Sequence, residues 1–130
     1  MQVHLVDGTY ELYRQHFGQA TRHSDPPPFA GTIGVLTSTI QLLQDGATHI
    51  GVATDHVIES FRNDLYDGYK TSEGMEPVLL EQIPILEDAL RAMGVTVWAM
   101  EKYEADDALA SAAAVACEDR TVHKVLILTP

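Results

Sequence analysis

Short apolar runs alternate with longer segments of helical periodicity along most of the chain. The runs are rich in Val, Ile and Leu, which is typical of buried strands. The segments between them carry apolar residues three and four positions apart, as on one face of an α-helix. We expect strands at residues 2–6, 49–54, 95–99 and 124–128, and helices at residues 10–17, 32–45, 77–93 and 105–117. This alternation favours an α/β fold in which a parallel sheet of about four or more strands carries helices on both faces.

Glycine and proline mark the ends of several elements. Gly46 and Gly94 follow helical patterns, and Pro77 stands where a helix would begin. Pro84 falls inside that helix, so we expect a kink or a restart there, because proline lacks an N–H group and clashes with the preceding turn. Residues 66–75 predict an exposed loop that is well placed for substrate contact. The second helical segment has an apolar stripe, which predicts its buried face: Ile33, Leu36, Ile40 and Leu43.

The composition is that of an ordinary globular domain. With 130 residues, of which 45% are hydrophobic and 21% charged, we expect one domain over residues 1–130. No apolar run is long enough to span a membrane and the N-terminus lacks the features of a secretory leader, so we expect a cytoplasmic protein. The single Cys117 excludes an internal disulfide, and its place in an alanine-rich helix predicts a small buried side chain.

Three acids gather at the start of one predicted helix: Glu104, Asp106 and Asp107. Two ionised carboxylates about 4 Å apart repel by roughly 4 kcal/mol at an effective dielectric constant of ~20, so such a group usually binds a divalent cation or raises a pKa. Alternatively, acids in a first helical turn complement the helix dipole and cap free N–H groups. The segment alone does not decide between these interpretations.

Two further acids, Asp7 and Asp55, stand directly after predicted strands. In parallel α/β sheets, residues just past the carboxyl ends of strands converge on the functional crevice, so we expect distant acids to share one site. Taken singly, each is also a common turn or N-cap residue. The six His residues show no zinc-binding spacing. Any metal is therefore expected to be oxygen-bound, and Mg²⁺ or Mn²⁺ suits carboxylate ligands best.

The net charge of −11 argues against binding of nucleic acid by a broad basic face, so any phosphate contact has to be local. Arg62 and Lys70 flank a tyrosine-rich stretch that includes Tyr69. Cations and aromatics interleaved in this way can hold a phosphate and stack on a base, although the same pattern fits a solvated surface turn. Arg14 follows Asp7 on the next helix and is a further candidate to approach the acids.

Together, the motifs resemble the 5′-3′ exonuclease and flap endonuclease family, which includes the 5′-nuclease domain of bacterial DNA polymerases. The resemblance covers nearly the whole chain. It rests on motifs in this order: Leu5-Val6-Asp7-Gly8, Phe61-Arg62, Tyr66-Asp67-Gly68-Tyr69-Lys70, Tyr103-Glu104-Ala105-Asp106-Asp107 and Val125-Leu126-Ile127-Leu128-Thr129. It implies a PIN-like α/β nuclease core.

The resemblance implies divalent-metal-dependent hydrolysis of DNA near a 5′ end or at a 5′ flap, with a DNA polymerase as a candidate partner. Two Mg²⁺ or Mn²⁺ ions would be held, directly or through water, by five acids: Asp7, Asp55, Glu104, Asp106 and Asp107. Lys70, Arg14 and Arg62 match family positions that contact the scissile or neighbouring phosphates. Tyr69 would either stack on a terminal base or pack within the protein.

The sequence departs from the family pattern at three places. A further aspartate pair after the fourth strand and a helix-hairpin-helix region are absent from these residues, and Thr71-Ser72-Glu73 stands where a further cation is common. The chain is therefore expected to be the front portion of a nuclease. Two alternatives stay open: a non-catalytic fragment that binds nucleic acid or protein, and a different enzyme on a similar sheet, such as a small phosphatase or an RNA-cleaving PIN-type nuclease.

Overall fold

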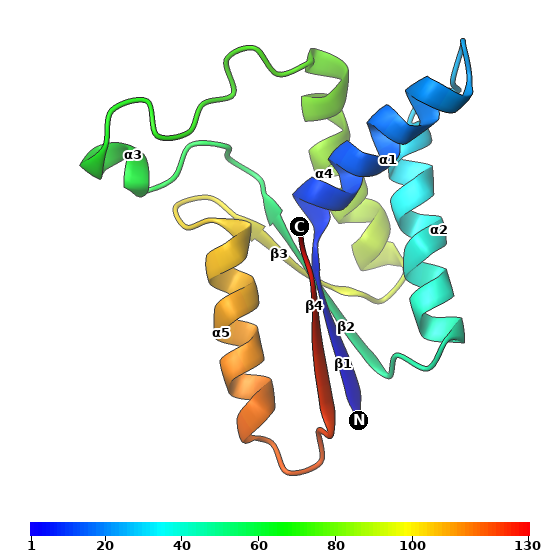
Figure 1. The fold of residues 1–130 in the computed structure, drawn as a ribbon, viewed down its shortest axis with the longest axis vertical. Helices are drawn as coiled ribbons and strands as arrows, with labels where there is room; N and C mark the ends of the chain where they lie inside the picture. The colour runs from blue at the N-terminus through cyan, green and yellow to red at the C-terminus, as the bar shows by residue number, and fades with distance from the viewer.

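The computed structural model describes residues 1–130 and contains a four-stranded parallel sheet in the order β3-β2-β1-β4 (Figure 1). The strands are β1 (Gln2–Asp7), β2 (His49–Asp55), β3 (Thr96–Met100) and β4 (Lys124–Leu128). The helices are α1 (Gly8–Arg22), α2 (Ala30–Gln44), α3 (Arg62–Leu65), α4 (Pro77–Ala92) and α5 (Ala105–Glu118). The predicted α/β fold class is confirmed.

Helices cover both faces of the sheet. Figure 1 shows α1, α2 and α4 on one side and α5 alone on the other. The strand order explains this division, because the chain moves from β1 through β2 to β3 and then crosses back to β4. Right-handed crossovers in opposite directions place their helices on opposite faces. The larger core cluster, which includes Val52 and Leu86, lies on the three-helix side, and a smaller one with Leu5 and Leu109 lies under α5.

The alternation of side chains along β1 and β2 decides which residues meet α5. Leu5 and Ala53 belong to the cluster under α5. Because successive side chains of a strand point to opposite faces, the residues two positions further along, Asp7 and Asp55, also lie on the α5 face. Asp7 pairs with Ala53 in the sheet, so Asp55 lies on the neighbouring strand two residues further along than Asp7.

Two helices differ from the sequence-based expectation. α1 begins earlier than residue 10, because Asp7 caps it by accepting a hydrogen bond from Tyr10 N at 3.0 Å, and it continues past residue 17 to Arg22. α4 runs without interruption through Pro84, so the expected restart is wrong. Pro84 is exposed, so the proline lies on the solvent side of α4 rather than in the core. None of the helices combines the length and the apolar character that a membrane span requires.

The buried face of α2 is not the predicted apolar stripe. Three residues of the stripe are about half exposed: Ile33, Ile40 and Leu43. Thr32 and Thr39 are buried instead, because their hydroxyl groups donate to Gln82 Oε1 and to Val35 O at 3.0 and 2.8 Å. Cys117 is exposed rather than buried, since it lies in the last turn of α5, past the helix residues of the small core cluster.

Candidate active site

The acids identified in the sequence come from three segments that meet at the carboxyl edge of the sheet: Asp7, Asp55, Glu104, Asp106 and Asp107. Ala105 N donates to Asp55 Oδ1 at 3.1 Å, which ties the start of α5 to the end of β2. Glu104 N donates to Asp107 Oδ2 at 2.8 Å, a contact that caps α5. The capping interpretation is thus correct for Asp107, and acids from separate segments also lie at the same edge of the sheet.

The start of α1 fixes Asp7 and Asp55, which are both buried. In addition to the contact with Tyr10, Asp7 accepts a hydrogen bond from Thr129 Oγ1 at 3.2 Å. The backbone N–H group of Asp55 donates to Thr9 Oγ1 at 2.8 Å. The ends of β1, β2 and β4 are therefore linked around these two carboxylates.

Lys70 lies between two of the acids. Its Nζ is 3.1 Å from Asp55 Oδ1 and 3.2 Å from Glu104 Oε1. Burial lowers the pKa of Lys70, but the two carboxylates raise it by more, so the pKa lies above its ordinary value. Tyr69 Oη lies 3.4 Å from Glu104 Oε2, and its ring is about half exposed. The predicted Tyr69-Lys70 pair therefore reaches the acids.

Arg62 binds Asp107 through both terminal nitrogens, with Nη1 3.0 Å from Oδ2 and Nη2 2.8 Å from Oδ1. Its Nη1 also donates to Glu104, and the guanidinium carbon lies 4.6 Å from the centre of the Phe61 ring. The hydrogen bonds from Arg62 hold the pKa of Asp107 below its ordinary value. Burial raises the pKa of Glu104, but the bonds from Arg62 and Lys70 outweigh it and the pKa is lowered.

Asp7 and Asp106 have no such cation, since neither takes part in an ion pair. Burial raises the pKa of Asp7, and the charges of Asp106 and Asp55 raise it further, against the hydrogen bonds from Tyr10 and Thr129. The site therefore has one half in which carboxylates are paired with cations and one half in which they repel each other.

The donor set suits a divalent metal, because it consists of carboxylate oxygens and carries excess negative charge around Asp7. In the observed arrangement, however, no three His, Cys, Asp or Glu side chains converge on one point that could hold an ion. Glu104 and Asp107 are directed to Arg62 instead. The chemical types of these residues thus suit a metal, but Asp55, Glu104 and Asp107 are paired with Lys70 and Arg62.

The structure does not bring Arg14 to the acids. Its Nη2 lies 2.8 Å from Glu11 Oε2, and it lines a groove between α1 and α2 together with Arg22. Arg14 stands seven positions after Asp7, which places it about 10 Å further along the helix axis. The hydrogen bond from Arg14 to Glu11 raises the pKa of Arg14.

The sequence did not single out the residues that hold the loop around Lys70. Asn63 Nδ2 donates to Lys70 O at 2.6 Å, and Asn63 Oδ1 accepts from Ser60 N at 3.0 Å. Ser60 Oγ in turn lies 3.4 Å from Glu104 Oε2. Asn is common in any turn, so nothing in the sequence pattern distinguishes this residue.

A buried acid behind β2 was also missed. Glu87 of α4 is only 2% exposed, accepts a hydrogen bond from Thr54 Oγ1, and lies 2.7 Å from His56 Nδ1 through Oε1. The signal was available, because Glu87 falls among the apolar positions of α4, where a charged residue needs a partner. Thr54 faces the three-helix side, so this contact lies behind the sheet rather than within the acid cluster.

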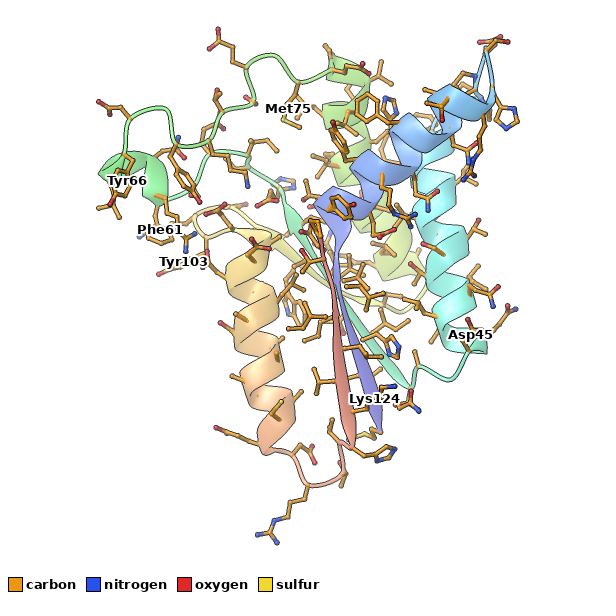
Figure 2. All side chains as sticks on the ribbon, in the orientation of Figure 1. Asp45, Phe61, Tyr66, Met75, Tyr103 and Lys124 are labelled. Carbon is orange, nitrogen blue, oxygen red and sulfur yellow. The ribbon has the colours of Figure 1, made fainter.

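Aromatic side chains border the acids on the outer side. Figure 2 shows Phe61 and Tyr103 close together beside the start of α5, and their ring centres are 5.3 Å apart. They line one end of an apolar groove of about 860 Å³ that runs along α5 and also contacts Asp107 and Trp98. Tyr66 lies farther out on the loop in Figure 2 and is 69% exposed. Flat apolar surfaces therefore adjoin the charged groups.

Comparison with known proteins matches residues 2–130 to the family described as 5′-3′ exonuclease, N-terminal resolvase-like domain. The chain is 31% identical over 125 residues to DNA polymerase I of Bacillus caldotenax, covering 94% of the chain and 14% of that protein. It is 30% identical over 130 residues to the thermostable DNA polymerase I of Thermus aquaticus, covering 98% and 15%. It is 34% identical over 116 residues to a 5′-3′ exonuclease of Mycoplasma pneumoniae, covering 82% and 39%. The chain therefore spans only a minor part of each relative.

Proposed function

The chain belongs to the family of 5′-3′ exonuclease N-terminal resolvase-like domains, and from this we propose that it hydrolyses phosphodiester bonds in DNA, near a 5′ end or at a 5′ flap. The family supports a nuclease function. The observation that carries the proposal is the contact of Asp55, Glu104 and Asp107 with Lys70 and Arg62 at the carboxyl edge of the sheet, with Asp7 and Asp106 beside them. Acidic and cationic groups side by side suit a reaction on a phosphate diester.

Nucleases of this family generally use divalent metals. We propose two ions, Mg²⁺ or Mn²⁺, with ligands drawn from the five acids: Asp7, Asp55, Glu104, Asp106 and Asp107. When bound, such ions supply an activated water and neutralise the charge that develops on the phosphate. Asp7 and Asp106 are the best placed to attract the first ion, because their negative charges are not compensated by a protein cation.

The cations of the loop are proposed to bind the substrate phosphates. Lys70 offers a compact charge on a stem held between β2 and α5, and Arg62 offers a planar fork that matches two phosphate oxygens. Phe61 and Tyr103 offer ring surface beside these charges for a base, as does Tyr69. Arg14 is proposed to contact a phosphate more distant from the acids.

Several relatives are DNA polymerases, so we propose that the domain processes DNA ends next to a polymerase activity, in DNA replication and repair.

Cleavage of an end-labelled 5′-flap DNA, with Mg²⁺ or Mn²⁺, tests the proposal. We expect product from the parent chain and a loss of at least about 100-fold in Asp106→Asn, a larger effect than removal of an outer partner of a metal ligand. Asp88→Asn removes the same charge from an exposed site on α4 and should cleave like the parent. An RNA flap of the same sequence distinguishes DNA-directed from RNA-directed cleavage.

A second candidate function is binding of nucleic acid without cleavage. It is favoured by the pairing of Glu104, Asp107 and Asp55 with protein cations, and by the lack of a preformed metal-binding group. A folded parent chain that retains the flap DNA but gives no product with either metal would support this function instead.

A further inference from the structure

Arg62 engages the acids that the proposed function assigns to metal. Asp107 has two oxygens, and Arg62 donates to both of them. Oδ2 of Asp107 also accepts the hydrogen bond from Glu104 N. A carboxylate that receives these three bonds presents little free lone-pair capacity to an additional cation on that side.

The Glu104 carboxylate is similarly occupied. Its Oε1 accepts from Lys70 Nζ, and its Oε2 accepts from Arg62 Nη1 and lies within 3.4 Å of the Tyr69 and Ser60 hydroxyl groups. Glu104 is only 8% exposed, so its side chain has little room to turn away while Arg62 remains in place.

We propose that Arg62 occupies the place of a divalent cation in the metal-free domain, and that its release from Glu104 and Asp107 sets the affinity of the site for metal. The inference rests on the proposed function, because it takes these acids to be metal ligands. Arg62 is a long side chain on the four-residue helix α3, so release requires rotation of the side chain rather than movement of β2 or α5. The freed guanidinium then has an unpaired fork beside Lys70, ready for a phosphate.

Metal affinity measured by calorimetry with Mg²⁺ tests the proposal on the 130-residue chain. We expect Arg62→Met to bind Mg²⁺ about tenfold more tightly than the parent, because one unit of positive charge next to the ion is removed and both carboxylates are released. Arg91→Met, which removes an exposed guanidinium paired with Asp88 on α4, should leave the affinity unchanged. Equal affinity of Arg62→Met and the parent, within twofold, would overturn the inference.

Arg62→Lys separates occupation of the carboxylates from a simple effect of charge. Lysine keeps the charge but cannot bind both oxygens of Asp107, so we expect an affinity between those of the parent and Arg62→Met. Parent-like affinity in Arg62→Lys would assign the effect to charge alone and would contradict the inference. If neither the parent nor Arg62→Met binds Mg²⁺, the metal dependence in the proposed function fails; if both bind equally, only the inference fails.

Nuclear magnetic resonance of arginine side chains gives a direct readout. A guanidinium held by two carboxylates rotates slowly, so Arg62 should show separate N–H signals that Arg62→Met lacks. Mg²⁺ should merge or shift these signals in the parent, while the backbone signals of β2 and α5 remain those of a folded domain. Unchanged Arg62 signals at saturating Mg²⁺ would show that Arg62 does not leave the acids.

Discussion

The amide group of Asn63 donates to the backbone carbonyl of Lys70 at 2.6 Å, across the loop that separates the Phe-Arg and Tyr-Lys motifs. This single bond joins the short helix that carries Arg62 to the residue whose ammonium lies between Asp55 and Glu104. The placement of both cations therefore depends on a side chain that contacts neither acid.

Substitution of that residue should affect the loop more than the fold. Asn63→Ala removes one hydrogen bond at each end of the side chain, so we expect a loss of about 1 kcal/mol in unfolding free energy and a lower rate of flap cleavage. Gln41→Ala is the matched control, because its amide serves only an exposed contact with Asp45. Urea denaturation measures the unfolding free energy and the flap assay measures the cleavage rate. Parent-like values of both in Asn63→Ala would show that Asn63 does not position the loop around Lys70.

Asp7 should make stability depend on pH. Its pKa is raised above the ordinary value of 3.8, mainly by burial. The neutral form is therefore favoured in the folded state, and this stabilisation is present below pH 3.8 and is lost as the pH rises through the folded pKa. Asp7→Asn keeps the cap on α1, so without metal we expect it to be more stable than the parent at neutral pH and similar at low pH.

Thermal unfolding of Asp7→Asn and the parent, measured from low pH to neutral pH, checks this expectation. Asp88→Asn is the control at an exposed position. Addition of Mg²⁺ should reverse the order at neutral pH, since metal at about 100 times its dissociation constant adds about 2.7 kcal/mol to a parent that keeps its ligands. A parent that is as stable as Asp7→Asn at neutral pH without metal would show that the burial of Asp7 is already compensated.

Lys70 should govern the salt dependence of DNA binding. In a chain with a net charge of −11, few cations are available to contact phosphates. Loss of one contact should weaken binding and reduce the slope of log K against log salt concentration by about 0.7–0.9. Fluorescence anisotropy with a labelled single strand measures the slope for Lys70→Met and for Lys124→Met, the control, which removes an exposed lysine at the start of β4, at the opposite edge of the sheet. Equal slopes in the two variants would show that Lys70 does not contact a phosphate.

Gly8 should be the most sensitive glycine near the site. A Cβ at this position would lie 2.7 Å from Val52 Cγ1 and 3.1 Å from the carbonyl oxygen of Ala53, and Val52 is fully buried. We expect Gly8→Ala to cost about 1–3 kcal/mol through overpacking. Gly18 of the same helix has nothing within 4 Å, so Gly18→Ala should gain about 0.5–1 kcal/mol from helix propensity. Urea denaturation of the pair decides whether α1 contacts β2 this closely.

His4 should be replaceable with a gain in stability. It is buried in β1, and its Nδ1 has no hydrogen-bond partner. Because an unsatisfied buried polar group costs about 1–3 kcal/mol, His4→Leu should raise the unfolding free energy by an amount in that range. His23→Leu at an exposed position provides the comparison. A destabilised His4→Leu would indicate that the imidazole packs better than an aliphatic side chain.

The sequence predicts the fold well because strands and their flanking glycines follow local rules. Each expected strand lies within one or two residues of the observed one, and the acids that end β1 and β2 lie at the same edge of the sheet, as parallel topology requires. The face of α2 could not be predicted in this way. Its buried threonines satisfy their hydroxyl groups inside the fold, and Gln82, a partner of Thr32, lies fifty residues away.

Side-chain pairing within the site was even less accessible to sequence reasoning. Arg14 and Arg62 carry the same group, and both follow an acid-bearing strand. Arg14 finds Glu11 one turn away on its own helix, whereas Arg62 reaches Glu104 and Asp107 from another segment. An acid on the same helix and an acid from a distant segment compete to pair with one arginine. Only the three-dimensional arrangement shows which pair forms.

The side-chain alternation that places Asp7 and Asp55 on the α5 face makes the site sensitive to strand length. One residue inserted in β2 would turn Asp55 toward α4, while two would restore its direction and displace it along the strand by about 7 Å. Variants with insertions in residues 49–54 should therefore keep the fold more often than the activity. The orientation of Asp55 should be recovered only when the number of inserted residues is even. Length changes in this domain are consequently better tolerated in loops away from the acids, such as residues 23–29 between α1 and α2, than in the strands that present the acids.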